Sequence, residues 1–294
     1  RQFQMRRVLG FRARGLCPGE VAIRAILALF LFIAGTLWGQ VASNSLAPGA
    51  TFSTLQAAID AGTNDYTVWV YADSSTAGVW ITNKQNLNLL LEPGHAPVHL
   101  IASAPGMGNG LFITNSTNIV VRGLSVTNFA IGILVGAACT NIRLTLNELI
   151  STSASATRGI ALEGPLAVNC QITSNRLLGG SLAHGISMNN GSHSNLVFSN
   201  TIQGFANGVF LGLTTVVSNN RVVGNRFVSN GNDGIYLFNS SRENLVANND
   251  FLGAGNHRGI HASGSASSNT FASNTVTGGA YGVFCDSISD QFIL

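Results

Sequence analysis

The residues best suited to chemistry in this 294-residue chain recur beside a repeated glycine. One set immediately precedes each glycine and consists of Ile131, Arg158, His184, Asn207, Asp233, Arg258 and Tyr281. A second set lies two residues after each glycine and consists of Leu134, Ala161, Ser187, Phe210, Tyr236, His261 and Phe284. From residue 207 onwards the two sets combine aromatic rings with charged and hydrogen-bonding groups. Sugar rings stack on aromatic faces while their hydroxyls and carboxylates need donors, so this pattern indicates a polysaccharide-binding surface.

The same residues indicate which reaction such a surface would support. Abstraction of a proton beside a uronate carboxylate requires a base and a cation that neutralises the carboxylate. The catalytic candidates for this lyase or epimerase chemistry are Asp233, Arg258 and His184. The substrate-binding candidates are Arg158, Asn207, Phe210, Tyr236, His257 and His261. Glycoside hydrolysis is less well supported, because it needs two carboxylates roughly 5–10 Å apart and the set that contains Asp233 has no second acid.

Simpler interpretations of these residues stay open. Stacked aromatics stabilise neighbouring strands without a ligand, by about 0.2–1 kcal/mol per pair. Arg258 beside Asp233 would then be a surface ion pair worth about 0–1 kcal/mol. His257 and His261 are spaced like metal ligands, but Gly259 lies between them and no acidic or cysteine ligand accompanies them. We therefore predict no metal site, and no cofactor is evident from the residues.

These residues must be positioned by a repeat that runs through residues 110–285. Each copy opens with a glycine followed by an apolar, a variable and an apolar residue. The glycines recur every 22–27 residues and are Gly110, Gly132, Gly159, Gly185, Gly208, Gly234, Gly259 and Gly282. A first asparagine column follows, made of Asn118, Asn141, Asn169, Asn195, Asn220, Asn244 and Asn269. A second column is made of Asn147, Asn175, Asn200, Asn225, Asn249 and Asn274, with Leu124 in its place in the earliest copy.

A repeat of this length and content predicts an all-β fold, a parallel β-helix. Apolar residues alternate with period two, which is typical of strands, and glycine, asparagine and serine separate the short runs. One copy cannot close a core alone, so successive coils must stack. Stacking places like residues about 4.8 Å apart. An asparagine amide carries both a donor and an acceptor, so the asparagine columns predict internal ladders that bond one coil to the next.

Residues 1–43 have the layout of a secretory signal peptide. A basic stretch precedes an apolar run of 14 residues, 25–38, and Val41, Ala42 and Ser43 supply small residues for cleavage. The run is too short to span a bilayer comfortably, so a membrane partner is expected only if the leader stays uncleaved. The leader carries a net charge of +5 and the remainder −2, which together give the +3 of the chain. A nearly neutral mature protein has no electrostatic support for a nucleic-acid partner.

Residues 44–294 are expected to form one β-helix domain. A polar linker, 44–51, precedes a capping-box pattern at Ser53 and Gln56, and a short amphipathic helix then presents Leu55, Ala58 and Ile59 as a lid for the first coil. Strand-like runs follow at 68–70, 79–81, 87–91 and 98–100. The chain stops within a coil and without a cap, from which we expect truncation at the C-terminus. Cys139, Cys170 and Cys285 are odd in number and are interpreted as small buried apolar residues.

The helix, the irregular strands and the later repeats together resemble the right-handed parallel β-helix proteins of the pectin-lyase-like superfamily, over roughly residues 50–294. The resemblance implies a right-handed solenoid with an N-terminal capping helix, and calcium as the one cofactor to consider. The motifs at residues 184–187 and 232–235 are similar to strand motifs of polygalacturonase-type hydrolases, but they occur in the reverse order. That superfamily also includes lyases, esterases, epimerases, accessory proteins and adhesins, so the fold does not fix the function.

These observations predict a secreted protein, extracellular or periplasmic and monomeric, whose partner is a polysaccharide or cell-surface glycan. Binding is the primary expectation, and lyase-like cleavage or epimerisation is the reaction that the residues favour over hydrolysis. The alternative is a non-catalytic surface adhesin or accessory β-helix module, which the scarcity of acidic residues favours.

Overall fold

The computed structural model describes residues 41–46, 49–76, 78–151, 153, 155–180, 184–253, 258–286 and 291–293. The leader up to residue 40 and the predicted binding residue His257 lie outside the described residues. Cleavage of the leader therefore stays a prediction. Within the described ranges, no helix has both the length and the apolar character needed to cross a membrane.

Among the described residues, short strands assemble into three large sheets, here called A, B and C. Sheet A contains, in spatial order, β2 (Thr51–Phe52), β1 (Ala42–Asn44), β3 (Asn64–Val70), β6 (Gln85–Leu91), β9 (Val120–Arg122), β12 (Arg143–Thr145), β15 (Gln171–Thr173), β18 (Leu196–Phe198), β22 (Arg221–Val223), β26 (Leu245–Ala247), β29 (Thr270–Ala272) and β32 (Phe292–Ile293). Sheet B contains β4 (Ser74–Thr76), β7 (Val98–Ala102), β10 (Leu124–Thr127), β13 (Glu148–Ser151), β16 (Arg176–Gly179), β19 (Thr201–Gln203), β23 (Arg226–Val228), β27 (Asp250–Leu252) and β30 (Thr275–Thr277). Sheet C contains β5 (Val79–Thr82), β8 (Asn109–Thr114), β11 (Ile131–Val135), β14 (Arg158–Glu163), β17 (His184–Asn189), β20 (Asn207–Leu211), β24 (Asp233–Leu237), β28 (Arg258–Ala262) and β31 (Tyr281–Cys285). A separate pair is formed by β21 (Val217–Ser218) and β25 (Ser241–Arg242).

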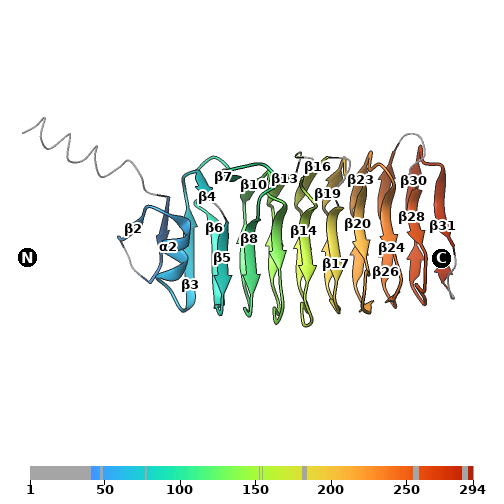
Figure 1. Ribbon diagram of the computed structural model, residues 1–294, viewed down its shortest axis with the longest axis horizontal. Helices are drawn as coiled ribbons and strands as arrows, with labels where there is room; N and C mark the ends of the chain where they lie inside the picture. Colours follow the sequence, from blue (N-terminus) through green and yellow to red (C-terminus); the bar gives the residue numbers. More distant parts are fainter. Residues whose placement is uncertain are drawn as a thin grey trace, which may run out of the picture. The chain divides into compact units, whose positions relative to one another are not determined.

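Each coil contributes one strand to sheet C, then one to sheet A and one to sheet B, before the chain returns to sheet C one level further on (Figure 1). Strands of successive coils pair in parallel, as Ile133 with Ile160 and Ile160 with Ile186 show. The predicted parallel β-helix is therefore confirmed, and residues one lap apart become neighbours.

The glycine column is explained by the close approach of the next coil. A Cβ atom on Gly132 would lie 2.6 Å from the carbonyl oxygen of Gly159, and one on Gly159 would lie 2.7 Å from that of Gly185. No side chain fits at such distances, so glycine at this position allows the strand to approach the strand of the next coil closely.

The second asparagine column forms the predicted internal ladder. Successive amides from Asn147 to Asn274 are joined by Nδ2–Oδ1 hydrogen bonds of 3.0–3.1 Å. Each of these oxygens also accepts from the backbone N–H of the preceding ladder residue, as Asn200 Oδ1 does from Asn175 at 2.8 Å. The ladder thus provides hydrogen-bond partners both for the buried side-chain amides and for the backbone N–H groups of the turns.

The first asparagine column is one column in the sequence but two ladders in the structure. Asn195, Asn220, Asn244 and Asn269 form a buried ladder with Nδ2–Oδ1 distances of 2.9–3.0 Å. Asn118 and Asn141 instead belong to an exposed ladder that begins at Asn86. The pairing of Gln171 with Leu196 aligns Cys170, not Asn169, with Asn195. The prediction of a single column was wrong here, because asparagine suits both the buried position and the adjacent left-handed position, where Asn169 has φ +55°.

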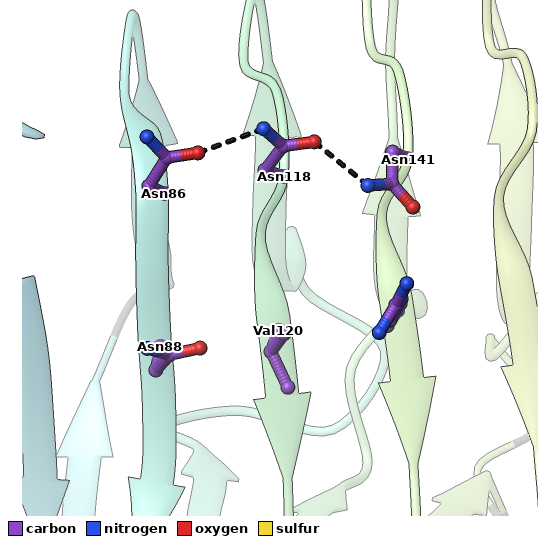
Figure 2. Close-up of a pocket in the computed structure, with 6 residues that line it drawn as sticks. Asn86, Asn88, Asn118, Val120 and Asn141 are labelled. Carbon is purple, nitrogen blue, oxygen red and sulfur yellow. Dashed lines mark hydrogen bonds between the residues drawn. The ribbon is translucent and has the colours of Figure 1, made fainter. Parts of the chain in front are cut away.

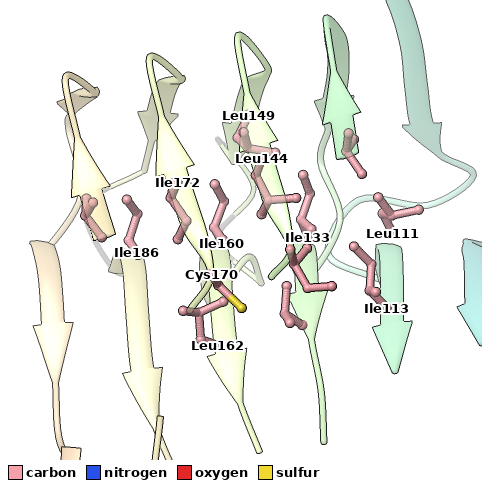
Figure 3. Packing of buried hydrophobic residues seen from close by; sticks show 14 of the residues in the cluster. Leu111, Ile113, Ile133, Leu144, Leu149, Ile160, Leu162, Cys170, Ile172 and Ile186 are labelled. Atoms are coloured by element: carbon pink, nitrogen blue, oxygen red, sulfur yellow. The ribbon is translucent and has the colours of Figure 1, made fainter. Parts of the chain in front are cut away.

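Apolar side chains from all three sheets fill the interior of the coils. Figure 3 shows this packing around residues such as Ile133, Ile160 and Ile186. Cys139 and Cys170 are buried free thiols within it, as predicted. Burial raises the pKa of Cys139, and it raises that of Cys170 to about 12. Cys285 is exposed, so the same prediction was wrong for it, because its coil has no further coil packed against it among the described residues.

The N-terminal lid is confirmed, with corrections in detail. The helix α2 (Leu55–Asp60) buries Leu55, Ala58 and Ile59 in the core. Its N-cap is Thr54, whose hydroxyl accepts from the Ala57 N–H at 3.1 Å, and not Ser53. Gln56 does not close a capping box; its amide pairs with the backbone N–H and C=O of Trp80 at 2.7 and 3.0 Å. The expected linker 44–51 contributes to β1 and β2, which pair antiparallel at the first edge of sheet A.

Candidate functional site

Both predicted sets of residues are stacked in register on the outer face of sheet C. The strands that carry the first set begin with its members, and the pairing runs through Ile131, Arg158, His184, Asn207, Asp233, Arg258 and Tyr281. The second set pairs in the same order from Leu134 to Phe284. The first set was expected to contribute to a polysaccharide-binding surface. Asn207 and Asp233 are instead buried, at 6% and 1% exposure, because their neighbours in the stack cover them.

A charged cluster is centred on the buried carboxylate of Asp233. Arg258 donates to it twice, from Nε at 2.5 Å and from Nη2 at 3.2 Å. Nδ1 of His261 lies 3.4 Å from Oδ2 on its other side. Asn207 is the third partner of this carboxylate. With its amide oriented so that both the nitrogen and the oxygen have hydrogen-bond partners, the nitrogen donates to Asp233 Oδ2 at 3.2 Å. The carboxylate is fully partnered and serves to hold these three side chains.

His184 is joined to this cluster through the same amide. The oxygen of Asn207 accepts from His184 Nδ1 at 3.2 Å, which fixes the neutral tautomer with its proton on Nδ1. Burial, with a further contribution from the charge of Arg158, lowers the pKa of His184 to about 4. The imidazole is therefore neutral at physiological pH. His184 lies three strands from Arg258 in the stack, or about 14 Å at the usual strand spacing.

Aromatic rings form a continuous run that begins at His184 of the first set and follows the second set from Phe210 to Phe284. His184 stacks on Phe210 with ring centroids 4.8 Å apart, and Phe210 meets Tyr236 edge-on at 5.5 Å. Tyr236 stacks on His261 at 4.4 Å, and His261 contacts Phe284 at 5.3 Å. At the end of the run, the guanidinium of Arg258 lies over the ring of Phe284, 5.4 Å from its centroid. Rings and donors are thus interleaved on one face.

Arg158 is held away from the Asp233 cluster. It forms an ion pair with Glu163 at 3.0 Å, on the same face of β14. Ala161 lies between these two positions on the strand and is fully buried. The structure brings together Asn207, Asp233, Arg258, His261 and Tyr236, with His184 and Phe210 continuing the row, whereas Arg158 forms a neighbouring pair of its own.

Several residues of this face were missed from the sequence. Glu163 and Asp286 both lie four residues after a repeat glycine, a third outward column that was not considered. Asp286 is placed with Oδ1 3.4 Å from His261 Nε2, so the imidazole lies between two carboxylates. Trp80 and Phe112 extend the second column in the other direction, with centroids 4.8 Å apart, and Trp80 is 53% exposed. The signal for Trp80 was Gly78, which precedes it as the repeat glycines precede their aromatics.

The arrangement bears on glycoside hydrolysis and on metal binding. Asp233 and Asp286 flank an imidazole and do not face a shared open space, so the two-carboxylate geometry of glycoside hydrolysis is not favoured. Among the residues that the structure describes, no three His, Cys, Asp or Glu side chains cluster so as to hold a metal ion. Calcium binding stays a prediction.

Two hollows lie on the outer face of sheet A and not on this face. One, of about 350 Å³, is lined by asparagines and Arg143. The other, of about 430 Å³, lies between Trp69, His95 and Arg122. On this face of sheet C the stacked side chains of Ser187, Asp233 and His261 are buried, whereas Tyr281 at the end of the face is 53% exposed.

Comparison with known proteins adds a family and several similar folds. A family model described as "right handed beta helix region" matches residues 109–276. No curated protein matches this chain in sequence. ORF18 of Geobacillus virus E2 is 13% identical with a TM-score of 0.54, and the alignment covers 95% of this chain and 66% of that one.

Two alginate enzymes are also similar in structure, at lower TM-scores. A double mutant of a periplasmic alginate epimerase is 16% identical with a TM-score of 0.49, over 77% of this chain. The chain spans 61% of the length of that epimerase. An alginate lyase from Paenibacillus sp. str. FPU-7 is 13% identical with a TM-score of 0.45, over 75% of this chain and 99% of the lyase. At these identities the likeness concerns the fold alone.

Proposed function

Because the chain belongs to the right-handed β-helix family, whose model matches more than half of it, we propose that it is an exported protein that binds a polysaccharide along the outer face of sheet C. The binding face is defined as the stacked residues from Arg158 to Phe284. The fold supports a long ligand because each coil repeats the same outward positions at the strand spacing of about 4.8 Å.

The observation that carries this proposal is the exposed end of the binding face, where a cation and aromatic rings adjoin. Tyr281 is 53% exposed and contacts Phe284, whose ring lies under the guanidinium of Arg258. Arg258 uses Nε and one terminal nitrogen on Asp233, and a guanidinium has five N–H donors in total. The remaining donors can bind a ligand carboxylate or hydroxyl while a sugar ring stacks on Tyr281. An acidic polysaccharide fits this combination best.

Binding of soluble polyuronates and of neutral polysaccharides to the full chain tests the proposal. Replacement of Tyr281 by alanine removes an exposed ring without disturbing the core, and we expect polyuronate affinity to fall about fivefold. Phe198→Ala is the matched control, because Phe198 is an aromatic residue that is 44% exposed on sheet A, outside the binding face. Unchanged affinity in Tyr281→Ala, or an equal loss in Phe198→Ala, would remove the proposed site.

Elimination or epimerisation at a uronate is a second candidate, and the contact of His261 with Asp233 favours it. A carboxylate that orients an imidazole is a common arrangement for a general base, and Arg258 in the same cluster would neutralise the substrate carboxylate. The base would take the proton beside that carboxylate. In elimination the glycosidic C–O bond on the neighbouring ring carbon would then break and its oxygen would take a proton from water, and in epimerisation a proton would return to the same carbon from the opposite face. The catalytic roles of Asp233, Arg258 and His184 remain predictions. At about 14 Å from Arg258, His184 is too distant to act on the same sugar. His261 belongs to the Arg258 cluster, but its Nε2 is buried beside Asp286, so it would act as the base only when Asp286 moves away.

The reaction is distinguished from plain binding by its products. A lyase releases unsaturated uronate ends that absorb ultraviolet light, and an epimerase changes the sugar stereochemistry seen by NMR without shortening the polymer. Loss of either product in His261→Gln, with polyuronate binding retained, would support catalysis. Binding with neither product, under conditions that keep the protein folded, would favour the non-catalytic adhesin or accessory module.

A further inference from the structure

The asparagine-lined hollow on sheet A has features of a binding site of its own. It has a volume of about 350 Å³ and lies across β6, β9 and β12. Two rows of side chains line it, and Figure 2 shows the upper row, Asn86, Asn118 and Asn141, above Asn88 and Val120. Arg143 continues the lower row, because it pairs in register with Val120.

The amides of the upper row keep hydrogen-bonding capacity for a ligand. Asn118 Nδ2 donates to Asn86 Oδ1 and Asn141 Nδ2 donates to Asn118 Oδ1, both at 2.7 Å. These bonds use one N–H and one oxygen lone pair of Asn118. A side-chain amide has two N–H donors and two acceptor sites, so half of its capacity remains. Asn118 is also exposed, and the remaining groups are open to solvent.

The lower row combines an apolar contact with a positive charge. Val120 is partly buried between Asn88 and Arg143 and offers a small apolar surface. The Arg143 side chain is exposed, and the described residues provide it with no ion pair. At the opposite end, Asp65 Oδ1 accepts from Asn86 Nδ2 at 2.6 Å. A ligand carboxylate is therefore attracted to the Arg143 end and repelled from the Asp65 end.

We propose that this hollow binds one acidic sugar of a uronate-containing oligosaccharide. The sugar carboxylate pairs with Arg143, its hydroxyls bond to the amides of Asn118 and Asn141, and the apolar side of its ring rests on Val120. The hollow is separate from the binding face of sheet C and shares no residue with it, so either site can fail without the other. Together the two sites would let one acidic polymer contact the protein on two sheets and gain from multivalency.

Calorimetric titration of the full chain with hexuronate trimers and with neutral hexose trimers tests the site. All variants carry Tyr281→Ala, which weakens the binding face of sheet C. Arg143→Gln removes the cation, and we expect affinity for hexuronate trimers to fall about tenfold, since a charge-assisted hydrogen bond is lost. Arg221→Gln is the matched control, because Arg221 is an exposed arginine in the same column of sheet A, outside the hollow.

A second variant, Asn118→Asp, places a negative charge in the hollow and keeps an acceptor for Asn141. It should weaken hexuronate binding at least as much as Arg143→Gln, and thermal unfolding checks that both variants stay folded. Equal loss in Arg221→Gln would overturn the assignment. So would tight binding of the neutral trimers, or the absence of hexuronate binding when the hollow is intact. Loss of polymer binding in Tyr281→Ala with trimer binding preserved would separate the two sites.

Discussion

Arg258 holds the buried carboxylate of Asp233 through hydrogen bonds of 2.5 Å and 3.2 Å. Asp233 is 1% exposed, whereas the side chain of Arg258 is 28% exposed and reaches the outer surface of sheet C. A buried charge is tolerated only while it is paired and hydrogen-bonded. The pair therefore connects the stability of β24 and β28 with the surface on which a ligand would lie.

Removal of Arg258 should destabilise the fold. Arg258→Ala leaves the Asp233 carboxylate with only His261 and Asn207, and we expect a loss of roughly 3 kcal/mol in the free energy of unfolding. Urea denaturation at neutral pH measures it. Arg176→Ala is the matched control, since the Arg176–Glu148 pair also joins neighbouring strands but the arginine side chain is 57% exposed. That change should cost less than about 1 kcal/mol, and equal losses in the two variants would contradict the buried-pair argument.

The fold was predictable because the physical demands of stacking recur once per coil. A glycine is needed wherever a Cβ atom would lie 2.6–2.7 Å from the carbonyl oxygen of the next coil, and a buried asparagine wherever one amide must hydrogen-bond to the next. Both demands select a single residue type, so they appear in the sequence as columns. The stacking of His184, Asn207, Asp233 and Arg258 followed from the same spacing and is confirmed.

Other features depend on contacts that the repeat does not encode. The burial of Asp233 results from its three partners, and the approach of Asp286 to His261 joins residues of two coils in different columns. Gln56 pairs with Trp80 across 24 residues, which no local capping pattern reveals. Cys170 occupies the buried position that was expected for Asn169. The sequence does not reveal this difference, because asparagine also suits the left-handed backbone beside the buried position.

The buried ladder should be far more sensitive to substitution than the exposed one. Asn200 is 1% exposed, accepts from Asn175 and donates to Asn225 and to the Ile172 carbonyl. Asn200→Ala leaves several of these groups unsatisfied, and we expect a loss of about 3 kcal/mol or more. Asn118→Gly, in the exposed ladder, should cost less than about 1 kcal/mol, because glycine accepts the left-handed backbone at φ +56° and water replaces the lost amide. Thermal unfolding of both variants checks this, and similar losses would show that burial is not the cause.

The glycine column offers a test of close packing. A Cβ atom on Gly185 would lie 2.5 Å from Cγ2 of Ile202 and 2.6 Å from the carbonyl oxygen of Gly208. Gly185→Ala should therefore destabilise the protein by roughly 3 kcal/mol, as overpacking does when backbone must move. Gly282 occupies the same position in the repeat but has no atom within 4 Å of such a Cβ. Gly282→Ala should change stability by less than about 0.5 kcal/mol, and a large loss there would point to a cause other than the neighbouring coil.

His184 should make the stability of the protein depend on pH in the mildly acidic range. Burial and the charge of Arg158 lower its pKa from 6.5 to about 4, so in this range the unfolded chain binds a proton more readily than the folded protein. Stability is then greatest above pH 6.5 and is lost as the pH falls toward 4, by up to about 3 kcal/mol in total. Urea denaturation across this range measures the slope.

The substitution His184→Gln isolates this contribution. It removes the titrating group and keeps an amide that can donate to Asn207, so the curve of stability against pH should become flatter between pH 6.5 and pH 4. His95→Gln controls for the loss of an imidazole at an exposed position. If His184→Gln kept the full acid sensitivity of the original chain, the neutral buried imidazole would not be its source. The same result would weaken the inference that Asn207 fixes His184 as a neutral tautomer beside the Asp233 cluster.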